Sequence, residues 1–283
     1  MKIVGTLLLS SSLCLGAAAV SAQEFGALME LSYGNQWFTE VEDSNGSEFE
    51  NSSESVIYGS VAAGLTFGAF GAQLDYIRQE SGNPLAGGAG FGANVTTLHA
   101  NYRTGAYAFG LFYGVGDNIP EVNSDDGKVE FGGVEVAANF ANYRIAGQIG
   151  SADHRNDHSS LDYSGRVYGI VEGQFYLDNG LTLSGSLGHG TGKIHSNDIN
   201  VTQIAFGVSK PLGSSGLVGT AGLRHTMVSD GGSTEGQGNT TDLLIGLTMP
   251  LGGGSVREVN ESSVSMIRTN LPAIIAAMTA VYD

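Results

Sequence analysis

Charged and amide side chains recur at every second position in segments that are otherwise rich in glycine and apolar residues. In residues 163–176, for example, Arg166, Glu172 and Gln174 share one parity, and residues of one parity lie on the same face of a β-strand. When alternate residues of every such segment are assigned to faces in this way, one face carries four bases and five acids: Arg103, Arg144, Arg166, Arg224, Glu30, Asp75, Glu135, Glu172 and Asp242. Opposed basic and acidic walls would select small polar solutes in a channel, whereas the same residues paired with one another would fill it.

Histidine and serine neighbours suggest a second chemistry, nucleophilic catalysis. The candidates are His189, His195 with Ser196, and His158 with Ser159. A serine nucleophile needs a base within hydrogen-bonding reach, and no partnering acid or amide stands at a readable spacing from these pairs. We therefore expect loop residues here, no catalytic residues and no enzyme.

Residues 153–158, with two histidines four apart and two aspartates, could bind a divalent ion on a helical turn. We favour a solvated loop and expect neither a metal nor a cofactor. The acidic stretch 39–54 would attract cations to the mouth of a channel, or it would form a soluble disordered loop.

The opposite parity in residues 163–176 is apolar, with Val167 and Val171 between Tyr163 and Phe175. A strand that crosses lipid turns its apolar face outward and its polar face to a lumen, with aromatic residues at the two interfaces. The charged set would then point inward.

Twelve segments follow this pattern, at 25–33, 55–67, 72–78, 94–103, 107–115, 129–140, 143–149, 163–176, 181–190, 199–210, 217–228 and 240–249. The connections after even-numbered segments are short, and those after odd-numbered segments are mostly longer and acidic, as in membrane barrels. The pattern predicts an all-β protein, a transmembrane antiparallel up-and-down β-barrel of about 12 strands over residues 23–251. Ten or fourteen strands are the alternatives.

The two ends of the chain differ from the barrel region. Residues 1–22 have a basic start, an apolar stretch and a small-residue cleavage site, which predicts a signal peptide that carries the only cysteine, Cys14. Residues 252–283 have apolar residues at roughly helical spacing, which predicts a partly helical periplasmic tail. Such a tail could lie on the membrane surface, plug the lumen or bind a periplasmic partner.

The formal net charge of −16 argues against a nucleic-acid partner. With 44 glycines in 283 residues and no apolar run long enough for a spanning helix, the composition favours short strands with frequent turns.

Signal peptide, alternating glycine-rich strands and aromatic strand ends together resemble the Gram-negative outer-membrane β-barrels, in particular the small porin-like proteins. The resemblance implies a passive channel for small polar solutes or ions in the outer membrane, surrounded by lipid and lipopolysaccharide, with both termini in the periplasm. The alternatives are a non-conducting surface barrel with an adhesive or structural role and an outer-membrane lipid hydrolase.

Overall fold

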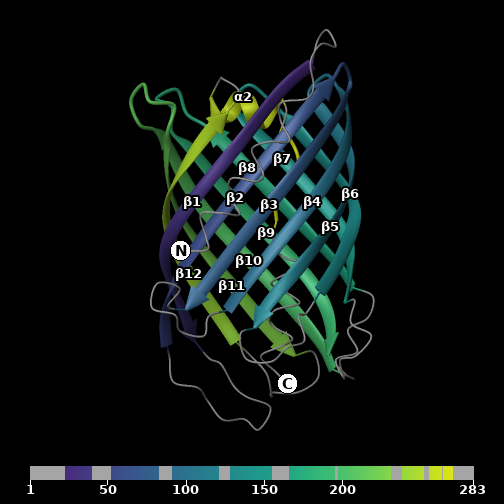
Figure 1. The fold of residues 1–283 in the computed structure, drawn as a ribbon, viewed down its shortest axis with the longest axis vertical. Helices are drawn as coiled ribbons and strands as arrows, with labels where there is room; N and C mark the ends of the chain where they lie inside the picture. The colour runs from purple at the N-terminus through teal and green to yellow at the C-terminus, as the bar shows by residue number, and fades with distance from the viewer. Residues whose placement is uncertain are drawn as a thin grey trace, which may run out of the picture.

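Twelve antiparallel strands form one sheet that closes on itself, because each strand pairs with its sequence neighbours and β12 pairs with β1 (Figure 1). The computed structural model describes residues 23–39, 52–82, 91–120, 128–154, 166–194, 197–230, 238–251, 255–262 and 264–269. The predicted class and strand number are confirmed. The predicted signal peptide lies outside the described residues.

The strands are β1 (Gln23–Thr39), β2 (Ser52–Phe67), β3 (Phe70–Gly82), β4 (Phe91–Thr104), β5 (Tyr107–Pro120), β6 (Lys128–Asn139), β7 (Tyr143–His154), β8 (Arg166–Tyr176), β9 (Thr182–Ile194), β10 (Asn197–Pro211), β11 (Val218–Asp230) and β12 (Gly238–Leu251). One helix, α2 (Val256–Glu261), follows β12. No helix in the described part of the chain is long and apolar enough to cross a membrane.

The outer face of the barrel is apolar and exposed. Leu111 is 63% exposed and Ile245 is 67% exposed, and both belong to a set of aliphatic residues on alternate positions: Leu31, Leu74, Leu98, Leu111, Val134, Val136, Ile145, Ile149, Val167, Val171, Leu183, Leu187, Leu223, Leu243, Ile245 and Leu247. Aromatic residues flank the aliphatic ones near the short turns: Phe67, Phe70, Tyr102, Tyr107, Tyr143 and Phe175. This arrangement is the one that contact with lipid requires.

Short turns join the strands at one end of the barrel. Two residues connect β2 to β3 and β4 to β5, and the first of each pair is a glycine at positive φ, 59° at Gly68 and 58° at Gly105. Glycine adopts this conformation without steric cost, which allows the tight reversal. The first residue of β1 pairs with Phe67, and Leu251 pairs with Ala27, so the barrel begins and ends at the short-turn end.

At the opposite end the strands are longer than predicted. β1 continues from Tyr33 to Thr39, and β7 continues to His154. The connection between the predicted segments 181–190 and 199–210 is shorter than expected, because β9 extends to Ile194 and β10 starts at Asn197. Backbone pairing continues there past the apolar belt, where polar and glycine residues carry no alternating signal.

The inner face of β3 to β8 is tightly packed. Phe112 lies opposite Gly133, and Phe131 lies opposite Gly114, in the pairing of β5 with β6. A Cβ atom at Gly114 would come within 2.2 Å of the Phe131 ring. The glycines thus make room for two aromatic rings, whose centroids are 6.3 Å apart.

The helix α2 lies at the short-turn end of the barrel (Figure 1). Its first turn is closed by a capping box, in which the Ser255 side chain accepts from the Glu258 N–H and the Glu258 carboxylate accepts from the Ser255 N–H. Val259 and Val264 pack against Leu28 and Ala62 on the inner wall. The chain after β12 therefore turns back into the barrel.

Candidate functional site: the barrel lumen

The predicted inward set lies on the inner face as expected. Asp75, Glu135, Arg144 and Asp242 are buried, although alternate residues on their strands are exposed to the outside. The predicted pore-lining residues Glu30, Arg103, Glu172 and Arg224 are half-buried on the same face. Only the backbone of Arg166 is described. That these residues line a conducting pore remains a prediction.

A buried imidazole lies between two carboxylates in the lumen. Nδ1 of His99 lies 2.8 Å from Oε1 of Glu135, and Nε2 lies 3.0 Å from Oδ2 of Asp75. Carboxylates accept hydrogen bonds, so this geometry suits an imidazole protonated on both nitrogens. The site links β3, β4 and β6 by charge-assisted hydrogen bonds.

Two arginine–carboxylate pairs complete the polar lining. Arg144 Nη1 donates to Glu172 Oε1 over 2.8 Å, and Arg224 Nε donates to Asp242 Oδ2 over 2.7 Å. Arg224 Nη2 also reaches Gln79 Oε1 at 2.8 Å, which connects β11 with β3 inside the barrel. Part of the predicted charged set therefore pairs across neighbouring strands.

The lumen also holds part of the chain that follows α2. We call residues 264–269 the lumenal segment. Met266 N–H donates to Gln73 Oε1 over 3.0 Å, and Gln73 Nε2 lies 3.4 Å from the Met266 carbonyl oxygen. Arg144 Nη2 donates to the Ser265 carbonyl oxygen over 2.6 Å, and Arg103 Nη2 donates to Ser265 Oγ over 3.0 Å. Of the three positions proposed for the tail, the structure shows this part inside the barrel.

Apolar side chains close the lumen around this segment. Met266 and Ile267 belong to one buried cluster with inward residues of β3 to β8, β10 and β11, among them Ile77, Val95, Phe112, Phe131, Tyr168, Ile170, Val201 and Val228. Tyr168 is only 1% exposed. The segment is therefore held by hydrogen bonds on one side and by apolar packing on another.

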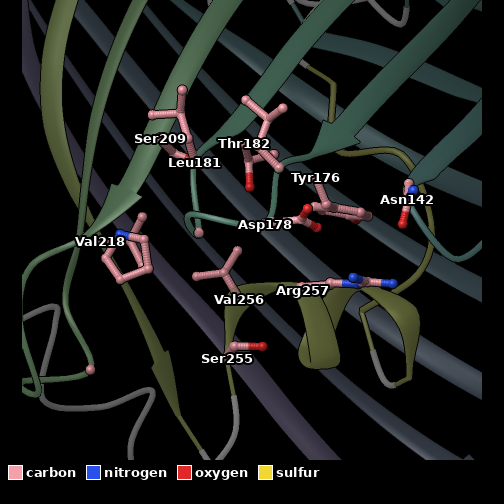
Figure 2. A pocket seen from close by; sticks show the side chains of 14 residues that line it. Asn142, Tyr176, Asp178, Leu181, Thr182, Ser209, Val218, Ser255, Val256 and Arg257 are labelled. Carbon is pink, nitrogen blue, oxygen red and sulfur yellow. The ribbon is translucent and has the colours of Figure 1, made fainter.

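The wall from β9 to β11 is different in its half nearest the short turns, because most inward residues there are small and half-buried: Ser184, Ser186, Ala205, Gly207, Ser209, Thr220 and Gly222. A cavity of about 410 Å³ opens at the short-turn end of this wall. Figure 2 shows Val256 and Arg257 of α2 facing Thr182 and Tyr176 across it. This side of the lumen has room that the β3–β8 side lacks.

Arg257 fixes α2 at the rim of this cavity. Its guanidinium donates from Nη2 to the Ala141 carbonyl oxygen over 2.6 Å and lies 4.5 Å from the centroid of the Tyr176 ring. Its Nε donates to Glu261 Oε1 over 2.7 Å, one turn further along the helix. The helix is thus joined to the β6–β7 turn and to the end of β8.

The residues of the alternative chemistries are dispersed or lie outside the described part. His189 lies on the exposed outer face, where Nδ1 is 2.9 Å from Thr202 Oγ1. The pairs at 158–159 and 195–196 lie outside the described residues, as does most of the acidic stretch 39–54 and of the proposed metal loop. Among the described residues, no group of three or more His, Cys, Asp or Glu side chains is arranged to hold a metal.

Sequence reasoning found the charged inner face and gave the lumen as one of three positions for the tail, but it did not identify which tail residues lie there. Ser265 and Met266 have no sequence feature that marks them as lumenal, since their backbone atoms make most of the contacts. Phe112 and Phe131 stand at inward-facing positions in the alternating pattern of their strands, opposite glycines. The sequence pattern therefore does indicate that both rings point into the lumen.

Comparison with known proteins gives loose matches in structure. No family model matches the chain, and no curated protein matches it. An outer membrane channel from Pseudomonas putida F1 is 14% identical, with 80% of this chain and 96% of that chain covered at a TM-score of 0.49. An anion-selective porin from Comamonas acidovorans is 9% identical, with 81% and 100% covered at a TM-score of 0.42.

The translocator domain of the autotransporter NalP from Neisseria meningitidis is 14% identical, with 87% and 94% covered at a TM-score of 0.39. Because all three TM-scores are below 0.5, the class of protein is assigned from the geometry of this chain and not from these matches. A closed antiparallel sheet with an apolar outer belt and a charged interior is a transmembrane β-barrel. Within that class, this barrel has twelve strands and a lumen that contains part of its own C-terminal region.

Proposed function

We propose that the protein is an outer-membrane channel for small polar solutes or ions, with its lumenal segment acting as a plug. Both termini of the chain would face the periplasm, and lipid with lipopolysaccharide would surround the apolar belt. The charged inward residues would line the route. The proposal follows from the uneven filling of the lumen.

The single observation that carries the proposal is the half-buried inner wall of β9 to β11 with its cavity at the short-turn end. A barrel of eight strands is filled by its own side chains, and larger barrels leave space. Here serine, glycine and alanine leave that space on one side only. Arg224 and Asp242, which pair on the inner face of β11 and β12, would supply charge to the route.

An apolar cluster fills another part of the lumen, and Met266 and Ile267 belong to this cluster. Apolar constrictions block ions because water leaves them. Weakening the packing of Met266 in this cluster should therefore open the route, with no substitution in the barrel wall.

The test is single-channel recording of the refolded full chain in planar bilayers. Met266→Asp should give steady ohmic currents that the unaltered chain lacks or shows only as a smaller current, because a carboxylate is costly in the apolar cluster. Adding Ala205→Trp should lower the Met266→Asp current, since a ring at Ala205 would occupy the roomy wall. Leu187→Trp on the outer face is the matched control and should leave the current unchanged.

A non-conducting surface barrel is the second candidate, and the packed β3–β8 side of the lumen favours it. Silence from folded Met266→Asp protein would contradict the channel and leave this role.

A further inference from the structure

Two wall side chains bind the backbone of one dipeptide in the lumen, and a third, Arg103, binds its serine hydroxyl. The Gln73 amide lies against both the N–H and the carbonyl of Met266, and Arg144 binds the carbonyl of Ser265. An amide side chain that meets both backbone groups of one residue imitates the pairing of a neighbouring strand. Contacts of this kind recognise the backbone of a peptide segment that is not in a helix.

Each of these three groups is also held by a second wall residue. Gln73 Nε2 donates to both carboxylate oxygens of Asp75 over 2.9 Å. Arg144 pairs with Glu172 over 2.8 Å, and Arg103 Nε donates to Asn101 Oδ1 over 3.2 Å. These partners belong to the barrel wall, so the binding groups would keep their positions if the segment left. A preorganised site of this kind binds with a smaller entropic cost.

Side-chain selectivity comes from the apolar surroundings. Met266 and Ile267 pack into the large lumenal cluster, while Val264 packs against Leu28 and Ala62. Ser265 Oγ meets Arg103. The site therefore combines backbone recognition with places for two apolar residues after a small polar one.

We propose that the inner wall of β3, β4 and β7 is a binding site for a non-helical peptide segment, occupied here by residues 265–267 and exchangeable with a free peptide of the same sequence. This deepens the proposed function, because it makes the plug reversible. Its test is a binding measurement, which does not depend on whether the barrel conducts.

The experiment uses the full chain with a protease site inserted among the glycines at 252–254. The protein is refolded in detergent micelles and then cut, and the fraction of the C-terminal fragment that stays with the barrel is followed by size-exclusion chromatography. The cut wild type should retain its fragment. Gln73→Leu should weaken retention about tenfold, because two hydrogen bonds to Met266 are lost.

Gln203→Leu is the matched control, since Gln203 also points inward but bonds to Thr226 on the adjacent strand β11. Its retention should equal that of the wild type. Equal retention by Gln73→Leu and wild type would overturn the proposal, and so would immediate loss of the fragment from both.

A second measurement keeps the test valid if Gln73→Leu does not fold. A synthetic peptide of residues 255–269 should displace the labelled fragment from cut wild-type barrel, whereas the same peptide with Met266→Asp should compete at least about tenfold less well. Equal competition by the two peptides, or none by either, would contradict an exchangeable site. Release of the fragment without any current would refute the channel alone.

Discussion

At the scale of single residues, the lumen is stabilised by charge placed between opposite charges. His99 is fully enclosed, and each of its ring nitrogens faces a carboxylate, from Asp75 or from Glu135. Removing one member of such a buried group costs more than the group contributes as a whole, because the others stay buried without a partner. The imidazole therefore holds three strands together.

We expect His99→Leu to lower the free energy of unfolding by about 3–5 kcal/mol, since it leaves Asp75 and Glu135 buried without their shared donor. The measurement is urea unfolding in lipid vesicles, followed by the fluorescence of Trp37, the only tryptophan. His189→Leu is the control and should change stability little, because that ring lies on the exposed face. An equal loss in both variants would show that the carboxylate contacts contribute nothing.

Residue types on alternating positions predicted the inward charges correctly, including Arg144, Glu135 and Asp242. The partners of these residues could not be predicted, because pairing depends on register. Arg224 reaches Gln79 only because the barrel curves β3 toward β11.

At the scale of elements, α2 is a six-residue helix that depends on its cap and on packing. Helices this short are unstable alone. Hydrogen bonds from the backbone and side chain of Ser255 hold the pKa of the Glu258 carboxyl below its ordinary value. The carboxylate thus contributes to the folded helix wherever it is ionised.

Because the pKa of Glu258 is lowered in the folded state, its contribution is present above the ordinary pKa of glutamate and is lost as pH falls through the folded value. We expect Glu258→Ala to loosen α2 relative to the wild type at neutral pH. The difference should disappear in acid, once the pH is below the lowered pKa that Glu258 has in the folded state. The measurement is amide hydrogen exchange of residues 256–261 in both proteins, from neutral to acid pH. A difference that persists unchanged in acid would contradict the capping role of the carboxylate.

The strands of the barrel were predictable, whereas the segment after α2 was not. Alternation set the faces of β8 and the number of strands, since lipid enforces apolar residues on one side. Met266 and Ile267 matched a helical spacing but lie in a non-helical stretch. Its conformation follows from side chains of the barrel wall, which are distant in sequence.

At the scale of the whole molecule, the barrel reverses the usual arrangement of apolar and polar surfaces. Leu98 is 57% exposed, while Thr97 beside it is buried inside. In water this outer belt would cause aggregation, so the fold requires lipid.

We expect Leu98→Arg to destabilise the barrel in a bilayer by about 2–4 kcal/mol, because a charge would face the hydrocarbon. Leu212→Arg is the control. It adds the same charge in the exposed turn between β10 and β11 and should have little effect. Both are measured by the same unfolding experiment in vesicles. If Leu98→Arg were as stable as Leu212→Arg, the belt would not be in contact with lipid.

The most direct test of a channel plugged by its own chain is the current through one protein before and after its plug is removed. The full chain with a protease site at 252–254 is refolded and inserted into a planar bilayer, then cut and washed until the fragment is gone. We predict little or no current before removal, steady ohmic current afterwards, and renewed closure when the peptide of residues 255–269 is added back. An unchanged current, with the fragment shown to have left and the barrel still folded, would contradict the account.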